Sequence, residues 1–218
     1  DHLLTCNSSG KVALWETATA TPLWYFDTSS GAIPCLSGDR KTIGFCNGEK
    51  FGLFDIESRK FTGMAATPGP LGSPLTAFSP SGQRLACIAQ GRILVWETAT
   101  GKLLYDFETP GIHLLWNIGF PDDNFLIGGN LYVIDLENQL KLWQYSQGEK
   151  TLQFGKLTLA AVGSQGTAGA LMSLELPHKE ARDLLNKALT QPDLFVFREG
   201  TKVKLDVTGI PPADQTHV

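Results

Sequence analysis

The chain has 218 residues, a formal net charge of −4, 42% hydrophobic residues and only 18% charged residues. This length suits one domain, or one domain and part of a second, and it can bury a sizeable core without disulfides or metals. The charges are scattered with no basic run, which argues against a nucleic-acid surface. No apolar stretch is long enough to span a membrane as a helix.

The start of the chain carries no targeting information. Residue 1 is Asp1, no initiator Met is present, and no signal-peptide pattern follows. We therefore expect an internal start, and the sequence predicts no cellular compartment. The 23 Gly and 12 Pro, together with the few charges, favour short strands and tight turns over long solvated helices.

Four segments share one pattern, a β-type run that ends in an aromatic or branched residue followed by an acid. Their ranges are Lys11–Glu16, Lys50–Asp55, Arg92–Glu97 and Asn130–Asp135. Their last two residues, which we call the repeat anchors, are Trp15 and Glu16, Phe54 and Asp55, Trp96 and Glu97, and Ile134 and Asp135. Successive anchors are about 40 residues apart, which is the period of propeller blades.

The sequence around each anchor also predicts strands. Turn-forming residues precede three apolar runs, which are Thr42–Cys46, Arg84–Ile88 and Phe125–Ile127. A short polar turn and a further strand follow the anchors, as at Pro22–Phe26 and Lys102–Phe107. Each repeat therefore reads as up to four short antiparallel strands.

The best copy, Phe78–Lys102, reads FSPSGQRLACIAQGRILVWETATGK and resembles a WD40 repeat. The resemblance covers about residues 2–147. It implies a β-propeller in which the anchor aromatic packs between blades and the following acid lies near a turn. The copies are degenerate, because Trp-Glu or Phe-Asp replaces Trp-Asp and no Gly-His pair precedes any anchor.

We therefore predict a mainly β fold, with about four to five propeller blades of four-stranded antiparallel sheets in an incomplete ring and a small α+β unit after them. The expected blades span about residues 1–29, 30–70, 71–110, 111–149 and, in part, 150–176. The first repeat begins at about its second strand and lacks the inner strand. Further blades from the rest of the chain are therefore expected partners, because an open ring leaves its edges unpaired.

Residues 177–218 are predicted to form an α-β-β segment, which is either the start of a further domain or an appendage of the propeller. The spacing of apolar residues predicts a helix over His178–Thr190 and a hairpin around Glu199 and Gly200. The passage from Leu174 onward resembles the end of propellers in large multidomain bacterial proteins, particularly those of planctomycetes. The Gly-rich stretch 163–169 lacks Lys and does not fit a phosphate-binding loop.

No motif predicts a catalytic, cofactor-binding or metal-binding residue. The four cysteines lack ligand spacing, so we expect buried strand thiols. Asp122 and Asp123 are expected to form a solvated turn and not a calcium site. Glu16 and Glu97 occupy equivalent repeat positions, which favours a structural role over general acid catalysis. His113 and Trp116 begin a repeat, and either contact a ligand on one face or pack within a strand.

Two functions remain open. The first is a non-catalytic scaffold that binds a protein or peptide on a rigid face or rim. The alternative is a quinoprotein-like propeller enzyme, or an accessory module of a larger enzyme, because Trp15–Trp24 and Trp96–Tyr105 are similar to tryptophan-docking repeats. Absorbance after adding pyrroloquinoline quinone with Ca²⁺ discriminates between the two.

Overall fold

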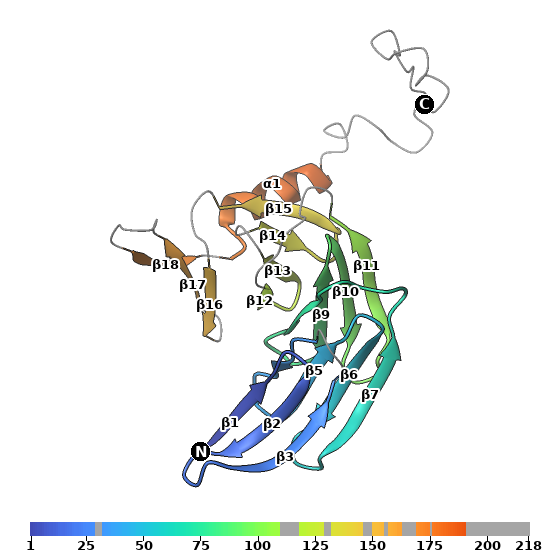
Figure 1. The fold of residues 1–218 in the computed structure, drawn as a ribbon. Coiled ribbons are helices and arrows are strands. Elements are labelled where there is room, and N and C mark those ends of the chain that lie inside the picture. The colour runs from blue at the N-terminus through green and yellow to red at the C-terminus, as the bar shows by residue number, and fades with distance from the viewer. Residues whose placement is uncertain are drawn as a thin grey trace, which may run out of the picture. The chain divides into compact units, whose positions relative to one another are not determined.

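The computed structural model describes residues 1–28, 32–109, 118–128, 132–145, 150–154, 157–162, 169–174 and 176–190. The chain divides into two compact units, Asp1–Ala181 and Arg182–Val218. The first unit contains five antiparallel sheets, numbered here in chain order (Figure 1). In each sheet, strands that follow one another in the sequence lie side by side, so every sheet is a simple meander.

The first three sheets correspond to the first three predicted repeats. Sheet 1 contains β1 (His2–Cys6), β2 (Lys11–Glu16) and β3 (Thr21–Asp27). Sheet 2 contains β4 (Cys35–Leu36), β5 (Thr42–Cys46), β6 (Lys50–Asp55) and β7 (Lys60–Ala66). Sheet 3 contains β8 (Leu75–Phe78), β9 (Arg84–Ala89), β10 (Arg92–Glu97) and β11 (Leu103–Glu108).

The remaining described elements are two sheets and one helix. Sheet 4 contains β12 (Ile118–Asp122), β13 (Phe125–Gly128), β14 (Tyr132–Asp135) and β15 (Leu140–Gln144). Sheet 5 contains β16 (Lys150–Phe154), β17 (Leu157–Val162) and β18 (Ala170–Leu174), and helix α1 spans Lys179–Thr190. The predicted fold class is confirmed: the protein is mainly β, its four-stranded sheets are of propeller type, and over the described residues they form no closed ring. The hairpin predicted around Glu199 lies outside the described residues.

The same β-bulge occurs at all four anchors. The strand that ends in the anchor shifts register against the next strand at the anchor residue itself, which is a β-bulge. The resulting opposed pairs are Trp15 and Pro22, Phe54 and Phe61, Trp96 and Leu103, and Ile134 and Lys141. The residues with positive φ in the turns that follow are Ala20, Arg59, Gly101 and Gln139. The same bulge and turn in four places show that these sheets repeat one local structure.

The core lies between successive sheets, and the anchor residues contribute to it. The Phe54 ring of sheet 2 stacks on the Phe26 ring of sheet 1, with centroids 4.2 Å apart. The Trp96 ring of sheet 3 stacks on Phe51 of sheet 2 at 4.9 Å and 12°. In sheet 4, Ile134 is fully buried in a cluster with residues of sheet 3. Each of these anchors therefore packs against the preceding sheet.

Gly44 in β5 allows sheets 2 and 3 to approach closely. A Cβ atom at this position would lie 2.8 Å from Leu85 and from the Phe78 ring, both of sheet 3. Real Cβ atoms do not come this close to other atoms, so a larger residue would force the Leu85 and Phe78 side chains, or the strands that carry them, to shift. Packing therefore favours glycine here, and its φ is not in the left-handed region.

The expectation of four buried thiols is wrong for Cys6. Cys46 and Cys87 are fully buried between sheets 2 and 3, and Cys35 is half-buried. Desolvation raises the pKa of the Cys35 thiol to about 12. Cys6 is exposed because it lies on β1, which is an edge strand of the three-stranded sheet 1. All four thiols are free.

Candidate binding surfaces

The acids of three anchors accept hydrogen bonds from the turn that follows them. Asp55 Oδ1 accepts from the backbone N–H of Ser58 at 2.7 Å, and Asp135 Oδ1 accepts from that of Asn138 at 2.9 Å. Glu97 Oε2 instead accepts from the hydroxyl of Thr100 at 2.5 Å. These bonds are local caps of tight turns.

Electrostatics also argue against proton transfer by Asp55. Hydrogen bonds from the side chain and then the backbone of Ser58 hold the pKa of Asp55 below its ordinary value. A carboxyl with a lowered pKa stays ionised near neutral pH and is a poor general acid. Glu16 is half-buried and stands opposite His2 in the pairing of β2 with β1.

Asp123 lies in the turn between β12 and β13 and is half-buried, and it also forms hydrogen bonds to sheet 3 that the sequence did not predict. Its Oδ1 accepts a hydrogen bond from the backbone N–H of Ser81 at 3.2 Å, and its carbonyl oxygen accepts one from Arg84 Nη1 at 2.6 Å. Partial burial opposes ionisation, but hydrogen bonds from Ser81 and Ser79 and the charge of Arg84 together lower the pKa of Asp123. The residue therefore links sheet 4 to the turn between β8 and β9.

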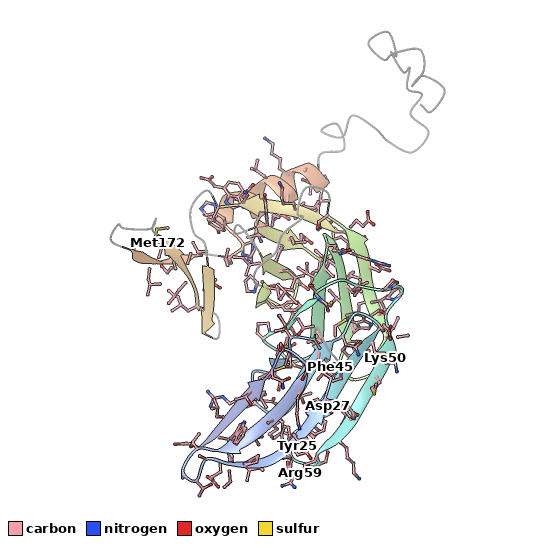
Figure 2. All side chains as sticks on the ribbon, in the orientation of Figure 1. Tyr25, Asp27, Phe45, Lys50, Arg59 and Met172 are labelled. Carbon is pink, nitrogen blue, oxygen red and sulfur yellow. The ribbon has the colours of Figure 1, made fainter. Side chains whose placement is uncertain are left out.

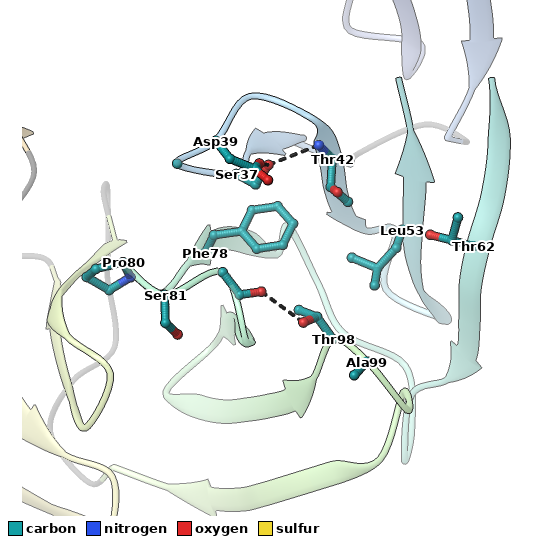
Figure 3. Close-up of a pocket in the computed structure, with 12 residues that line it drawn as sticks. Ser37, Asp39, Thr42, Leu53, Thr62, Phe78, Pro80, Ser81, Thr98 and Ala99 are labelled. Carbon is teal, nitrogen blue, oxygen red and sulfur yellow. Dashed lines mark hydrogen bonds between the residues drawn. The ribbon is translucent and has the colours of Figure 1, made fainter. Parts of the chain in front are cut away.

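A groove lies at the turns of sheets 2 and 3 (Figure 3). Its cavity volume is about 280 Å³. It is lined by hydroxyl-bearing, small and apolar residues, which are Ser37, Gly38, Asp39, Thr42, Leu53, Thr62, Phe78, Pro80, Ser81, Gly82, Thr98 and Ala99. We call this cavity the rim groove. Among the described residues, Asp39 is the single charged lining residue, so this part of the groove has a weakly negative character.

Two short hairpin turns give the rim groove a fixed backbone. The Ser37 hydroxyl donates to Asp39 Oδ1 at 2.6 Å and accepts from the Thr42 N–H at 2.9 Å. The hydrogen bond from Ser37, followed by that from the Lys41 amide, holds the pKa of Asp39 below its ordinary value. In sheet 3 the Thr98 hydroxyl donates to the carbonyl oxygen of Gly82 at 2.8 Å. The groove therefore presents an ionised carboxylate on a hydrogen-bonded frame.

A second cavity of about 530 Å³ adjoins the rim groove along the inner strands β4, β8 and β12. The two cavities share Gly38, Phe78 and Pro80 as lining residues. Within the part of the chain that the structure describes, no charged side chain lines the second cavity. It contains the buried Thr158, whose hydroxyl has no hydrogen-bond partner among the described residues. We call it the inner pocket, and its volume is in the range of ordinary ligand sites.

The third surface is the outward face of sheet 1. Directly opposed residues of paired strands share a face, and the register of β1, β2 and β3 places these residues together: Leu3, Thr5, Ala13, Trp15, Pro22 and Tyr25. Tyr25, which is labelled in Figure 2, is 64% exposed, and Leu3 is 53% exposed. An apolar cavity of about 430 Å³ opens on this face.

The structure does not test the predicted binding residues His113 and Trp116, which lie outside the described residues. It does show a hydrogen bond that repeats in three sheets and that the sequence did not predict. The hydroxyls of Thr28, Thr67 and Thr109 donate to the carbonyl oxygens of Gly10, Gly48 and Gly91, respectively. The recurring Gly-to-Thr separation of 18 or 19 residues was the available signal.

Metal-binding clusters and membrane-length helices are both absent from the described residues. They contain no group of three or more His, Cys, Asp or Glu side chains placed to hold a metal ion. Among the same residues, no helix has both the length and the apolarity needed to cross a membrane.

Comparison with known proteins places the fold. No protein-family model matches the chain, and no curated protein matches it either. Among solved structures, the chain is similar to the β-propeller domain of Cps50 (Swd1) from Myceliophteria thermophila, with a TM-score of 0.59 and 13% identity, over 80% of this chain and 68% of that one. It is also similar to the dihydro-heme d1 dehydrogenase NirN in complex with DHE, with a TM-score of 0.55 and 10% identity.

The match to NirN covers 80% of this chain and spans 41% of the length of that protein. Likeness at such low sequence identity establishes the fold and no more. The described sheets therefore have the β-propeller fold.

Proposed function

We propose that the chain is a non-catalytic scaffold, built from degenerate WD40-type repeats, that binds a protein or peptide partner. The observation that carries this proposal is the rim groove with its adjoining inner pocket. The two cavities provide hydroxyls, apolar rings and one ionised carboxylate on a backbone fixed by hydrogen bonds. Such a lining suits an extended peptide, which needs hydrogen bonds for its backbone and apolar contacts for its side chains.

The test is selection of random displayed peptides on the wild-type protein, followed by measurement of their affinity for a groove-filled variant. Gly38 is the position to fill, because its Cβ would meet only the carbonyl oxygen of Pro80, at 3.8 Å. Gly38→Trp therefore blocks both cavities without backbone strain. Gln144→Trp, at an exposed position on β15, is the matched control.

We expect the selected peptides to lose at least roughly tenfold in affinity for Gly38→Trp, equivalent to about 1.4 kcal/mol, and to bind Gln144→Trp normally. The proposal is wrong if selection enriches no peptide, or if the enriched peptides bind Gly38→Trp as well as they bind the wild-type protein.

A second candidate is a quinoprotein-like propeller enzyme or an accessory module of an enzyme. The similarity to the solved structure of the dihydro-heme d1 dehydrogenase NirN favours it. Titration with pyrroloquinoline quinone and Ca²⁺, followed by absorbance, separates the candidates. Stoichiometric binding supports the enzyme, whereas an unchanged cofactor spectrum supports the scaffold.

We also propose that the repeats belong to a large multidomain bacterial protein, because the passage from Leu174 onward resembles the end of propellers in such proteins.

A further inference from the structure

The Thr158 hydroxyl lies on a strand face that is apolar in the neighbouring sheets. The second strands of sheets 2, 3 and 4 bury these residues against the preceding sheet: Ile43, Leu85 and Leu126. In β17, the second strand of sheet 5, the equivalent face carries Thr158 and Ala160. Ala160 packs against Ile127 of sheet 4, and residues two apart in a strand share a face.

Thr158 has the burial of a core residue without the hydrogen bond that a buried hydroxyl needs. It is 1% exposed, and its hydroxyl has no partner among the described residues. Such a hydroxyl lowers stability, because water solvates it in the unfolded chain and nothing replaces that water on folding. Thr158 also lines the inner pocket, so a ligand in that pocket can supply the missing partner.

The other polar side chains around the inner pocket already have partners. The Thr76 hydroxyl donates to a backbone carbonyl oxygen at 2.7 Å, and the Cys35 thiol donates to another at 3.5 Å. The Ser79 hydroxyl accepts a hydrogen bond from the backbone N–H of Arg84 at 3.1 Å. Of the lining side chains that the structure describes, Thr158 alone still needs a hydrogen bond.

The rest of the lining selects an uncharged, largely apolar occupant. The described lining holds no charged side chain, and the raised pKa of Cys35, about 12, keeps that thiol neutral near neutral pH. A charged group would lose its water there without gaining an opposite charge. Phe78 and Phe120 line the pocket together with aliphatic side chains. An aromatic ring with a neutral hydroxyl matches both the apolar lining and the single unsatisfied hydroxyl.

We infer that the inner pocket binds the phenol of a tyrosine residue in the peptide partner, with the phenol hydroxyl hydrogen-bonded to the Thr158 hydroxyl. This inference rests on the proposed peptide-binding function. A free phenol is the other source of the same chemistry. The peptide is favoured because the inner pocket shares Gly38, Phe78 and Pro80 with the rim groove, so a peptide in the groove passes directly beside the pocket.

Two small probes separate the hydroxyl from the ring, since p-cresol is the tyrosine side chain and toluene is the phenylalanine side chain. Titrations of both are followed by the methyl chemical shifts of Ile127, which lines the pocket. The preference for p-cresol over toluene should be at least roughly tenfold larger in the wild-type protein than in Thr158→Val, which keeps the shape and lacks the hydroxyl. Thr21→Val, at an exposed position on β3, is the matched control and should keep the wild-type preference.

Urea denaturation of Thr158→Val tests whether the hydroxyl is unsatisfied in the absence of a ligand. The variant should unfold at the same urea concentration as the wild-type protein or at a higher one, because it removes a buried hydroxyl that has no partner. A lower midpoint would show that the hydroxyl is bonded within the protein, and it would overturn the inference.

The displayed peptides selected on the wild-type protein give the test on the partner itself. We expect a recurring tyrosine in the peptides that lose affinity for Gly38→Trp. Replacing this tyrosine by phenylalanine should weaken binding to the wild-type protein at least roughly tenfold and leave binding to Thr158→Val unchanged.

Three further results overturn the inference. The first is a probe preference that is the same in Thr158→Val and in the wild-type protein. The second is a set of peptides that depend on the groove and bind without a tyrosine, which leaves the proposed function intact. The third is p-cresol binding with no enriched peptide, because the pocket then serves a free phenol and the proposed function fails as well.

Discussion

The two tryptophan anchors differ in burial although they occupy the same position of the repeat, and this difference makes a quantitative prediction. Trp96 is 1% exposed, stacks on Phe51, and is surrounded by the apolar cluster between sheets 2 and 3. A Trp side chain buries about 200 Å². At about 25 cal/mol per Å², its burial is worth ~5 kcal/mol relative to the unfolded chain.

Trp96→Ala should therefore lower the free energy of unfolding by about 3 to 5 kcal/mol, because the Ala side chain keeps part of the burial and neighbouring side chains partly fill the cavity left behind. Trp15→Ala should cost clearly less, about 1 to 2 kcal/mol, because Trp15 is only half-buried in the described structure. Urea denaturation followed by far-ultraviolet circular dichroism measures both. Equal losses for the two variants would refute the assignment of Trp96, and not Trp15, to a buried interface between sheets.

Three further predictions concern packing, pH and thiol access. Gly44→Ala should destabilise the protein by about 1 to 3 kcal/mol in the same denaturation assay, and an unchanged midpoint would contradict the close approach of sheets 2 and 3. Asp123 has a lowered pKa when folded, so its stabilising effect is complete above about pH 4 and is lost as the pH falls further. The difference in unfolding midpoint between wild type and Asp123→Asn should therefore shrink below pH ~4, and a constant difference would contradict this linkage. Cys6 should react with a maleimide in the folded protein, whereas Cys46 and Cys87 should react only after unfolding, as counted by mass spectrometry.

The repeated strands could be predicted from the sequence because their signal is local. The runs Lys11–Glu16, Lys50–Asp55 and Arg92–Glu97 form strands with the expected bounds. In each of them an aromatic residue and an acid follow alternating or continuous apolar residues, and this pattern needs no knowledge of neighbours. The helix was equally accessible, since its apolar spacing and the preceding Pro177 mark its beginning within one residue.

Other features depend on which sheets meet, and the sequence does not reveal this. Asp123 has the sequence context of a solvated turn, yet it bonds to Ser81 because sheets 3 and 4 adjoin at their turns. Cys6 lies in a strand like Cys46 and Cys87, and its exposure follows only from the open edge of sheet 1. Positive φ at Arg59 and Gln139 has no glycine signal, because the bulge that requires it comes from strand pairing.

The rim groove could largely not be predicted from the sequence, because it also depends on which sheets pack together. The rim groove combines residues from the turns of two sheets, and Gly38 and Thr98 are brought together only by the packing of sheet 3 on sheet 2. None of its side chains belongs to a motif. Hydroxyl and glycine residues in turns are too common to indicate a binding surface until their positions in space are known.

The most direct test of the stacked-sheet architecture is a nuclear Overhauser measurement between aromatic rings of neighbouring sheets. The structure predicts cross-peaks between the rings of Trp96 and Phe51, whose centroids are 4.9 Å apart, and between those of Phe54 and Phe26, at 4.2 Å. Intact strands without these cross-peaks would contradict the account, because the sheets would then form without stacking through their anchors.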